Sequence, residues 1–177
     1  MKHQVGLLCG RFQPVHRGHI ELVREALLHC EHLIIVIGSA QESNTKRNPF
    51  DFETRKELLR RCLRGRNKYI TIIGVNDREE FADDSGWGDY LLAEVERQTG
   101  LVPTINFTGT EEVRSHWFDN ASIVSMEVNR NNLPISATAL REAILKDDYN
   151  TFALLAPTGL WLKYEFLRQR LEKIYHD

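Results

Sequence analysis

The chain has 177 residues, a length at which one compact domain can bury a substantial core. Apolar residues make up 42% of the chain and charged residues 27%, yet the formal net charge at pH 7 is only -2. This balance argues against a general attraction to nucleic acid or to an anionic membrane, so any anion must be bound locally.

Cysteine usage and the lack of a targeting signal predict a cytoplasmic protein. Cys9, Cys30 and Cys62 are far apart and include no CxxC pair, which favours reduced thiols over a zinc site or a secreted disulfide framework. No basic, apolar and small-residue sequence resembling a signal peptide opens the chain. No apolar run approaches the roughly 20 residues that span a bilayer, so we expect no membrane contact.

The opening third of the chain alternates between strand-like and helix-like segments. Residues 5–9 form a short apolar run, and residues 18–29 carry apolar side chains at helical spacing. Residues 33–37 are continuously apolar, which is typical of a strand buried on both faces of a parallel sheet. This order predicts a βαβ unit.

The same alternation continues toward the C-terminus. The predicted elements are, in chain order, a loop at 39–49, a helix near 52–63, a strand at 69–75, an acidic loop at 76–88, a helix near 90–98, strands at 104–108 and 122–128, and helices from 136 onward. The pattern predicts an α/β fold, a Rossmann-like open parallel sheet with helices on both faces and a helical C-terminal subregion. We expect residues 1–177 to form a single domain.

Residues 10–19, with the sequence GRFQPVHRGH, join the first predicted strand to the first predicted helix. Ligands of open α/β sheets bind at this edge, beyond the carboxyl ends of the strands. His16 and His19 flank Gly18 at the helix start, so their imidazoles can face one side beside unpaired backbone N–H groups, an arrangement that suits phosphate. The alternatives are solvated loop histidines or a zinc site, which lacks a nearby third ligand here.

An HxGH tetrad after an opening strand, preceded by Gly-Arg-Phe-Gln-Pro, resembles the signature of the nucleotidyltransferase superfamily, which includes class I aminoacyl-tRNA synthetases. The resemblance implies that His16 and His19 contact the triphosphate of ATP and stabilise the charge that develops on it. It further implies that Gly10, Arg11 and Phe12 belong to the same phosphate-binding loop, with Arg11 helping to clamp phosphate.

A second motif, ISATALR at residues 135–141, starts the predicted C-terminal helices. Ser136 can cap the helix, and Arg141, about one and a half turns later, can reach back toward an anion at that end. A capped helix without a ligand is the alternative. The segment resembles the ISGTxxR motif of the same superfamily, which implies that Ser136, Thr138 and Arg141 bind the phosphates of ATP. Ala137 replaces the commoner glycine.

The loop at residues 38–50, GSAQESNTKRNPF, follows the second strand and therefore lies at the same sheet edge. It resembles the nicotinamide-mononucleotide (NMN) adenylyltransferases of archaeal type and their bacterial relatives fused to Nudix domains. That resemblance implies a phosphate contact for Arg47, with Lys46 as its neighbour. Many relatives carry histidine where Asn44 stands. A solvated polar loop is the alternative.

The loop at residues 81–90 bears on the identity of the acceptor. We predict that Trp87 is exposed there, where its face can stack on a pyridinium ring and attract the positive charge. The family resemblance implies this role, since the family uses an aromatic residue for nicotinamide. The alternative is that Trp87 anchors the following helix. Asp83 and Asp84 are expected to be solvated or turn-forming.

Together the motifs predict adenylyl transfer from ATP to NMN, giving NAD and diphosphate, with Mg²⁺ bridging phosphates. His16, His19, Arg47 and Arg141 would act by positioning and charge stabilisation, because the ionised acceptor phosphate needs no base. Transfer to another phosphorylated acceptor such as phosphopantetheine, or a non-catalytic nucleotide-binding regulator, stays open. So does the choice between NMN and nicotinic acid mononucleotide. The family resemblance implies a homo-oligomer.

Overall fold

The computed structural model describes residues 3–81, 86–109, 117–118, 122–128 and 135–176. Its centre is a parallel sheet in the order β3-β2-β1-β4-β5. The five strands are β1 (His3–Gly10), β2 (Cys30–Ile37), β3 (Ile70–Gly74), β4 (Ile105–Gly109) and β5 (Val124–Val128). This order places β1 at the centre of the sheet. After β3 the chain crosses over, and β4 and β5 add to the opposite side of β1. The crevice beyond the carboxyl end of β1 is therefore the topological switch point, where ligands of such sheets bind.

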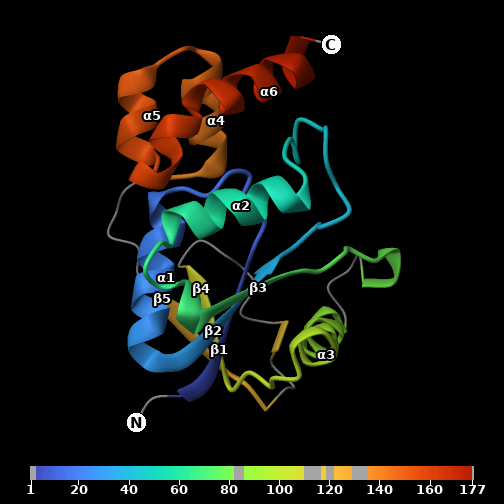
Figure 1. Cartoon of the computed structure of the whole chain (residues 1–177). Helices are drawn as coiled ribbons and strands as arrows, with labels where there is room; N and C mark the ends of the chain where they lie inside the picture. The colour runs from blue at the N-terminus through green and yellow to red at the C-terminus, as the bar shows by residue number, and fades with distance from the viewer. Residues whose placement is uncertain (1–2, 82–85, 110–116, 119–121, 129–134, 177) are drawn as a thin grey trace.

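Helices cover both faces of the sheet, as the sequence predicts (Figure 1). The side chain of Leu8 packs with α1 (Arg17–His29) and α2 (Phe52–Cys62), whereas that of Leu7 packs with α3 (Trp87–Thr99). Successive strand residues point to opposite faces, which explains why neighbouring leucines belong to different apolar clusters. Short 3-10 turns, η1 (Asn67–Tyr69) and η2 (Glu79–Phe81), flank β3.

The C-terminal helices pack above the carboxyl edge of the sheet (Figure 1). They are α4 (Ala137–Leu145), α5 (Tyr149–Leu155), the 3-10 segment η4 (Thr158–Lys163) and α6 (Tyr164–His176). Phe152, Leu160, Leu167 and Leu171 are fully buried in the apolar cluster that also contains the residues of α1 and α2. The predicted helical C-terminal subregion is therefore continuous with the core. A single domain at residues 1–177 stays a prediction, because a domain is defined by folding on its own.

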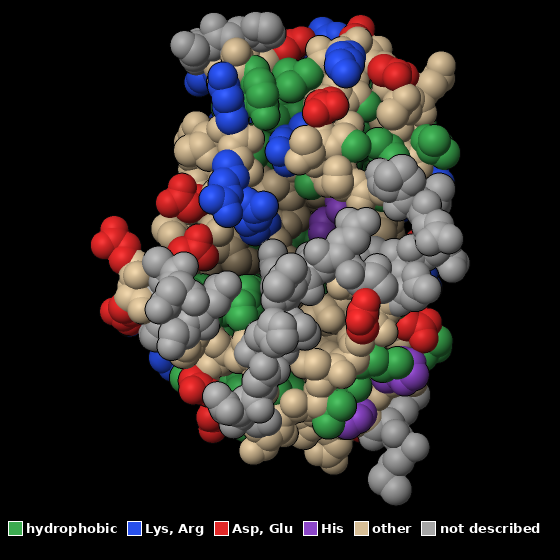
Figure 2. Space-filling view, turned by 180° about the vertical axis from the view of Figure 1, so that it is seen from behind, with side chains coloured by type: hydrophobic (Ala, Val, Ile, Leu, Met, Phe, Trp, Pro, Cys, Tyr) green, Lys and Arg blue, Asp and Glu red, His purple; other side chains and the backbone are tan. Residues whose placement is uncertain are grey.

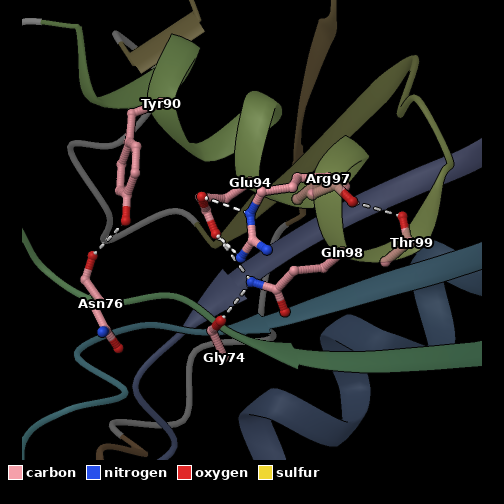
Figure 3. Close-up of polar contacts among 8 residues, drawn as sticks. Gly74, Asn76, Tyr90, Glu94, Arg97, Gln98 and Thr99 are labelled. Carbon is pink, nitrogen blue, oxygen red and sulfur yellow. Dashed lines mark hydrogen bonds and ion pairs between the residues drawn. The ribbon is translucent and has the colours of Figure 1, made fainter.

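Polar contacts fasten α3 to the chain that leaves β3 (Figure 3). The Gln98 side-chain amide donates to the carbonyl of Gly74 at 2.9 Å and to the Glu94 carboxylate at 3.2 Å. The Tyr90 hydroxyl donates to the carbonyl of Asn76 at 3.2 Å. These bonds satisfy one backbone carbonyl at the end of β3 and one just after it, and they hold α3 against that segment.

The predicted elements match the observed ones except at their ends. The helix predicted near residues 90–98 begins earlier, at Trp87, and the strand predicted at 122–128 begins at Val124. Cys9, Cys30 and Cys62 form no disulfide bond with one another. In the described part of the chain, no helix combines the length and apolar character that crossing a membrane requires.

Candidate active site

The loop after β1 is shaped by Phe12, which takes a positive φ of 51° and is 1% exposed. A Cβ on Gly10 would lie 3.0 Å from the ring of Phe12, so glycine leaves the space in which the ring folds back over the end of the strand. The same ring packs on His19, with the centroids 4.6 Å apart. The structure therefore makes Phe12 a support for His19.

The two histidines of the first motif stand together at the start of α1. Their rings stack with centroids 3.6 Å apart, and His16 is 3% exposed. The backbone N–H of His16 donates to Nδ1 of His19 at 3.2 Å. A ring nitrogen that accepts carries no proton, so the proton of a neutral His19 ring is on Nε2. Gly18 is buried in the first turn of the same helix.

Gln13 joins all three predicted motifs, although the sequence marks it only as part of the first. Its side-chain amide donates to the carbonyl of Phe50 at 2.9 Å and accepts the Phe50 N–H at 2.9 Å. Its own carbonyl accepts from Nη1 of Arg141 at 2.8 Å. The two bonds to Phe50 are buried and the bond from Arg141 is partly buried, and together they tie the loop after β1 to the basic loop and to α4.

The second motif begins α4 as predicted. The hydroxyl oxygen of Ser136 accepts the N–H of Ala139 at 3.0 Å, which is the expected N-cap. Nη2 of Arg141 donates to the hydroxyl oxygen of Thr138 at 3.3 Å. The Nε atom of Arg141 is buried and has no hydrogen-bond partner among the described residues.

The sequence interpretation missed Arg55. This residue of α2 bonds the backbone of the loops that form the site. Its side chain is fully buried and donates to four backbone carbonyls, those of Arg11 (3.0 Å), Gly38 (2.8 Å), Ser39 (2.9 Å) and Asp51 (3.3 Å). Burial lowers the pKa of Arg55 to about 10, so the guanidinium stays charged near neutral pH. One side chain thus fixes the loops that leave β1 and β2.

A sequence signal for Arg55 was present. Arg55 follows Phe52 by three residues and precedes Leu58 and Leu59 by three and four, so it falls on the apolar face of the predicted helix. A charged side chain on that face requires buried partners. The signal predicts burial, but it does not say which carbonyls are bound.

A cavity of about 660 Å³ opens at the carboxyl ends of β1, β2 and β3. Gly10, Arg11, Arg47 and Trp87 line it, together with residues that follow β2 and β3, among them Gly38, Ser39, Glu42, Asp77, Arg78 and Glu79. The cavity thus collects four of the predicted residues from three separate segments. Figure 2 shows one face of the molecule, where a histidine lies in a hollow with Lys or Arg side chains beside it.

The remaining predicted residues lie outside the lining of this cavity. His19 contacts Phe12, which follows the lining residue Arg11, and His16 stacks on His19. Arg141 bonds Gln13, the next residue of the same loop. Within the described ranges, no group of three or more His, Cys, Asp or Glu side chains is placed to hold a metal ion. Residues 83 and 84 lie outside the described part of the chain.

The expectation that Trp87 is exposed in a loop is wrong. It is 7% exposed and is the first residue of α3, where its ring packs 5.3 Å from that of Tyr90 and 5.8 Å from that of Trp117. Burying the large indole surface outweighs the polar character of its sequence neighbours. The anchoring alternative is correct for most of the side chain, and the remainder lines the cavity.

The chain is similar to proteins of known activity. Residues 7–143 match the cytidylyltransferase-like family. Over 163 residues the chain is 32% identical to the nicotinamide-nucleotide adenylyltransferase of Thermococcus sibiricus, covering 88% of this chain and 80% of that one. The chain therefore belongs to the cytidylyltransferase-like family and, within it, to the nicotinamide-nucleotide adenylyltransferases. The relative from Methanococcus maripaludis is 29% identical, with 85% of this chain and 82% of that one covered.

Solved structures show the fold of this adenylyltransferase family member. A bifunctional NMN adenylyltransferase/ADP ribose pyrophosphatase from Francisella tularensis, complexed with AMP and a manganese ion, superposes with a TM-score of 0.75 at 22% identity. The match covers 99% of this chain and 51% of that one, so this chain spans about half of the Francisella protein. Plasmodium falciparum nicotinic acid mononucleotide adenylyltransferase, complexed with APC, gives a TM-score of 0.63 at 14% identity.

Family membership confirms two predictions that were made from the motifs. The resemblance to the NMN adenylyltransferases is confirmed, and so is the assignment to a family of nucleotidyltransferase enzymes. The matched residues 7–143 contain both histidines, the basic loop and Arg141. The predicted Rossmann-like fold is confirmed by the strand order and by the solved neighbours.

Proposed function

We propose that this chain transfers the adenylyl group of ATP to NMN, giving NAD and diphosphate. The observation that carries the proposal is the convergence of Arg11 and Arg47 on one cavity, together with the stacked pair His16 and His19 at the end of the loop that contains Arg11. Cations and donors gathered at a helix start suit a triphosphate, and family membership supplies the pyridine nucleotide as its acceptor.

The reaction requires little covalent chemistry from the protein. An oxygen of the ionised acceptor phosphate forms a bond to the α-phosphorus of ATP. The bond between that phosphorus and the oxygen that bridges to the β-phosphate breaks, and diphosphate leaves with the bonding electrons. Catalysis then consists of alignment and of stabilising the charge that develops on the phosphates.

The side chains divide these tasks in the proposal. His19, with its proton on Nε2, donates to a phosphate oxygen, and the buried His16 holds the ring of His19 in place by stacking. Arg141 offers its Nε donor at the start of α4, where Ser136 and Thr138 shape the helix end. Arg47 faces the same cavity as Arg11 and clamps a second phosphate group.

ATP is proposed to enter as its magnesium complex. Mg²⁺ prefers oxygen ligands and commonly takes them from substrate phosphates, one or two carboxylates and water. Glu42, Asp77 and Glu79 line the cavity, and one or two of these carboxylates are proposed to add to the phosphate ligands, since no three described His, Cys, Asp or Glu side chains are placed to hold a metal ion by themselves. The Francisella neighbour, which was complexed with AMP and a manganese ion, supports the use of a divalent cation.

An acceptor panel tests the proposal. The purified chain is mixed with ATP or CTP and each of NMN, nicotinic acid mononucleotide, phosphopantetheine and glycerol phosphate, and diphosphate release is measured. We expect release with ATP and NMN, together with NAD detected by chromatography. Release only with phosphopantetheine or glycerol phosphate would move the chain to another acceptor, and no release with any pair would favour a nucleotide-binding regulator.

Trp87 is proposed to contact the nicotinamide ring with the part of its indole that lines the cavity. A Trp87→Phe protein should raise the KM for NMN about two- to tenfold, since an aromatic contact contributes ~0.5–1.5 kcal/mol. The KM for ATP should stay within about twofold. Trp161→Phe is the matched control, because Trp161 lies on η4, outside the cavity lining. An unchanged KM for NMN would leave Trp87 as an anchor of α3 alone.

Homo-oligomeric assembly and a cytoplasmic location stay predictions. So does the preference between NMN and nicotinic acid mononucleotide, for which the acceptor panel gives the ratio of kcat/KM values directly.

A further inference from the structure

Arg47 lies at the tip of a small hydrogen-bonded turn. The N–H of Thr45 donates to the carbonyl of Asn48 at 3.3 Å, and the N–H of Asn48 donates to the hydroxyl oxygen of Thr45 at 2.9 Å. These two bonds close the turn around Lys46 and Arg47. Arg47 lines the cavity, so its placement there depends on what holds the turn itself.

The C-terminal helix α6 holds this turn from outside. Nη2 of Arg170 donates to Oδ1 of Asn44 at 2.8 Å, and the hydroxyl of Tyr175 donates to the carbonyl of Lys46 at 3.2 Å. The ammonium of Lys46 lies 5.5 Å from the centroid of the Tyr175 ring. These contacts join residues 126 and 129 positions apart, and Figure 1 shows the loop between β2 and α2 rising beside the end of α6.

The bond from Arg170 also matches the unusual backbone of Asn44. Asn44 has a φ of 58°, in the left-handed region that few residues other than glycine adopt readily, although Asn tolerates it better than most. A hydrogen bond to its side chain helps to hold that conformation. The same Nη2 atom lies 4.0 Å from the carboxylate of Asp51, at the other end of the loop.

Helix α6 is a firm support because it is anchored elsewhere. Leu167 and Leu171 are fully buried in the core cluster, whereas the side chain of Arg170 is 33% exposed. The contacts to the turn are therefore separate from the contacts that fold the helix. Removing them should loosen the turn and leave α6 in place.

We propose that Arg170 and Tyr175 are positioning residues that hold Arg47 at the cavity, so that the C-terminal helix sets the geometry of phosphate binding. The inference rests on the proposed function for the role of Arg47. An arginine that meets a phosphate bidentately must be placed closely, and a misplacement of about 1 Å can cost as much as a hundredfold in rate. Neither residue is proposed to touch substrate.

The kinetic test is a double-mutant cycle between Arg170 and Arg47. Arg170→Met should lower kcat/KM about tenfold in the native background and less than about twofold in an Arg47→Ala background, because its effect passes through Arg47. Arg168→Met is the matched control on the same helix, since Arg168 contacts Asp147, Glu165 and Glu172 instead. It should change kcat/KM less than about twofold.

A second readout needs no catalysis. Trypsin cuts after Lys46 and Arg47, and cleavage requires local opening of the turn. Arg170→Met should raise the cleavage rate there about tenfold and Tyr175→Phe about threefold, while Arg170→Lys should restore most of the protection. Arg168→Met should cleave like the native protein, and urea unfolding should confirm that all variants are folded.

Failure of the positioning role and failure of the proposed function give different results. Equal losses of kcat/KM in both backgrounds, or native cleavage rates in Arg170→Met, would overturn the positioning role. If the native chain forms no NAD, the proposed function fails, and the cleavage rates still decide whether α6 holds the turn.

Discussion

A His19→Ala protein is expected to lose about two to three orders of magnitude in kcat for NAD formation, the loss typical of removing one donor to a developing negative charge. The proton of the neutral ring is on Nε2, because Nδ1 accepts the backbone N–H of His16. Stability should fall by only about 1 kcal/mol, because the ring gives up contacts with Phe12 and His16 at the edge of the core.

His29→Ala is the control for this prediction. His29 lies at the end of the same helix and pairs with Glu25 at 3.2 Å, with its side chain 38% exposed. It should retain native turnover. Stopped assays of NAD formation and urea unfolding measure the two quantities. A folded His19→Ala protein with native kcat would remove His19 from the catalytic machinery.

The second large effect is expected on stability. Arg55→Leu should lower the free energy of unfolding by about 3–5 kcal/mol, since it leaves several buried carbonyls without their charged donor. These carbonyls belong to the loops after β1 and β2 and to the residue that caps α2. Leucine cannot replace the fork of donors that reaches separate segments.

Two further variants serve as controls for Arg55→Leu. Arg60→Leu, on the exposed side of the same helix, should change the free energy of unfolding by no more than about 0.5 kcal/mol. Arg55→Lys should recover only part of the loss, because one ammonium cannot donate in all the directions that the guanidinium does. Urea unfolding measures all three. Equal stability of Arg55→Leu and Arg60→Leu would contradict the clamp.

The elements that the sequence predicted well are those whose signal is local. Residues 33–37 are continuously apolar and form the C-terminal part of β2, where every residue is buried. Ser136 caps α4 because its hydroxyl bonds an N–H only three residues away. Periodicity and capping are properties of neighbouring residues, so they can be read before the fold is known.

The environments of Trp87 and Arg55 depend on segments that are distant in sequence. Glycines and acids surround Trp87 in sequence, yet Trp117, from a distant segment, packs against its ring. The position of Arg55 on an apolar helix face was visible, but its partners come from loops that only the sheet brings together. Pairing over long sequence distances has no local signature.

The sequence by itself determined the fold class and the family, because the motifs of a family need particular residues at fixed short spacings. Tertiary structure decided which of these residues meet. It joined Gln13 to Phe50 and Arg141, buried Trp87, and placed α6 against the turn that carries Arg47. Those contacts depend on packing in three dimensions, where burial and hydrogen-bond satisfaction outweigh the preferences of any single segment.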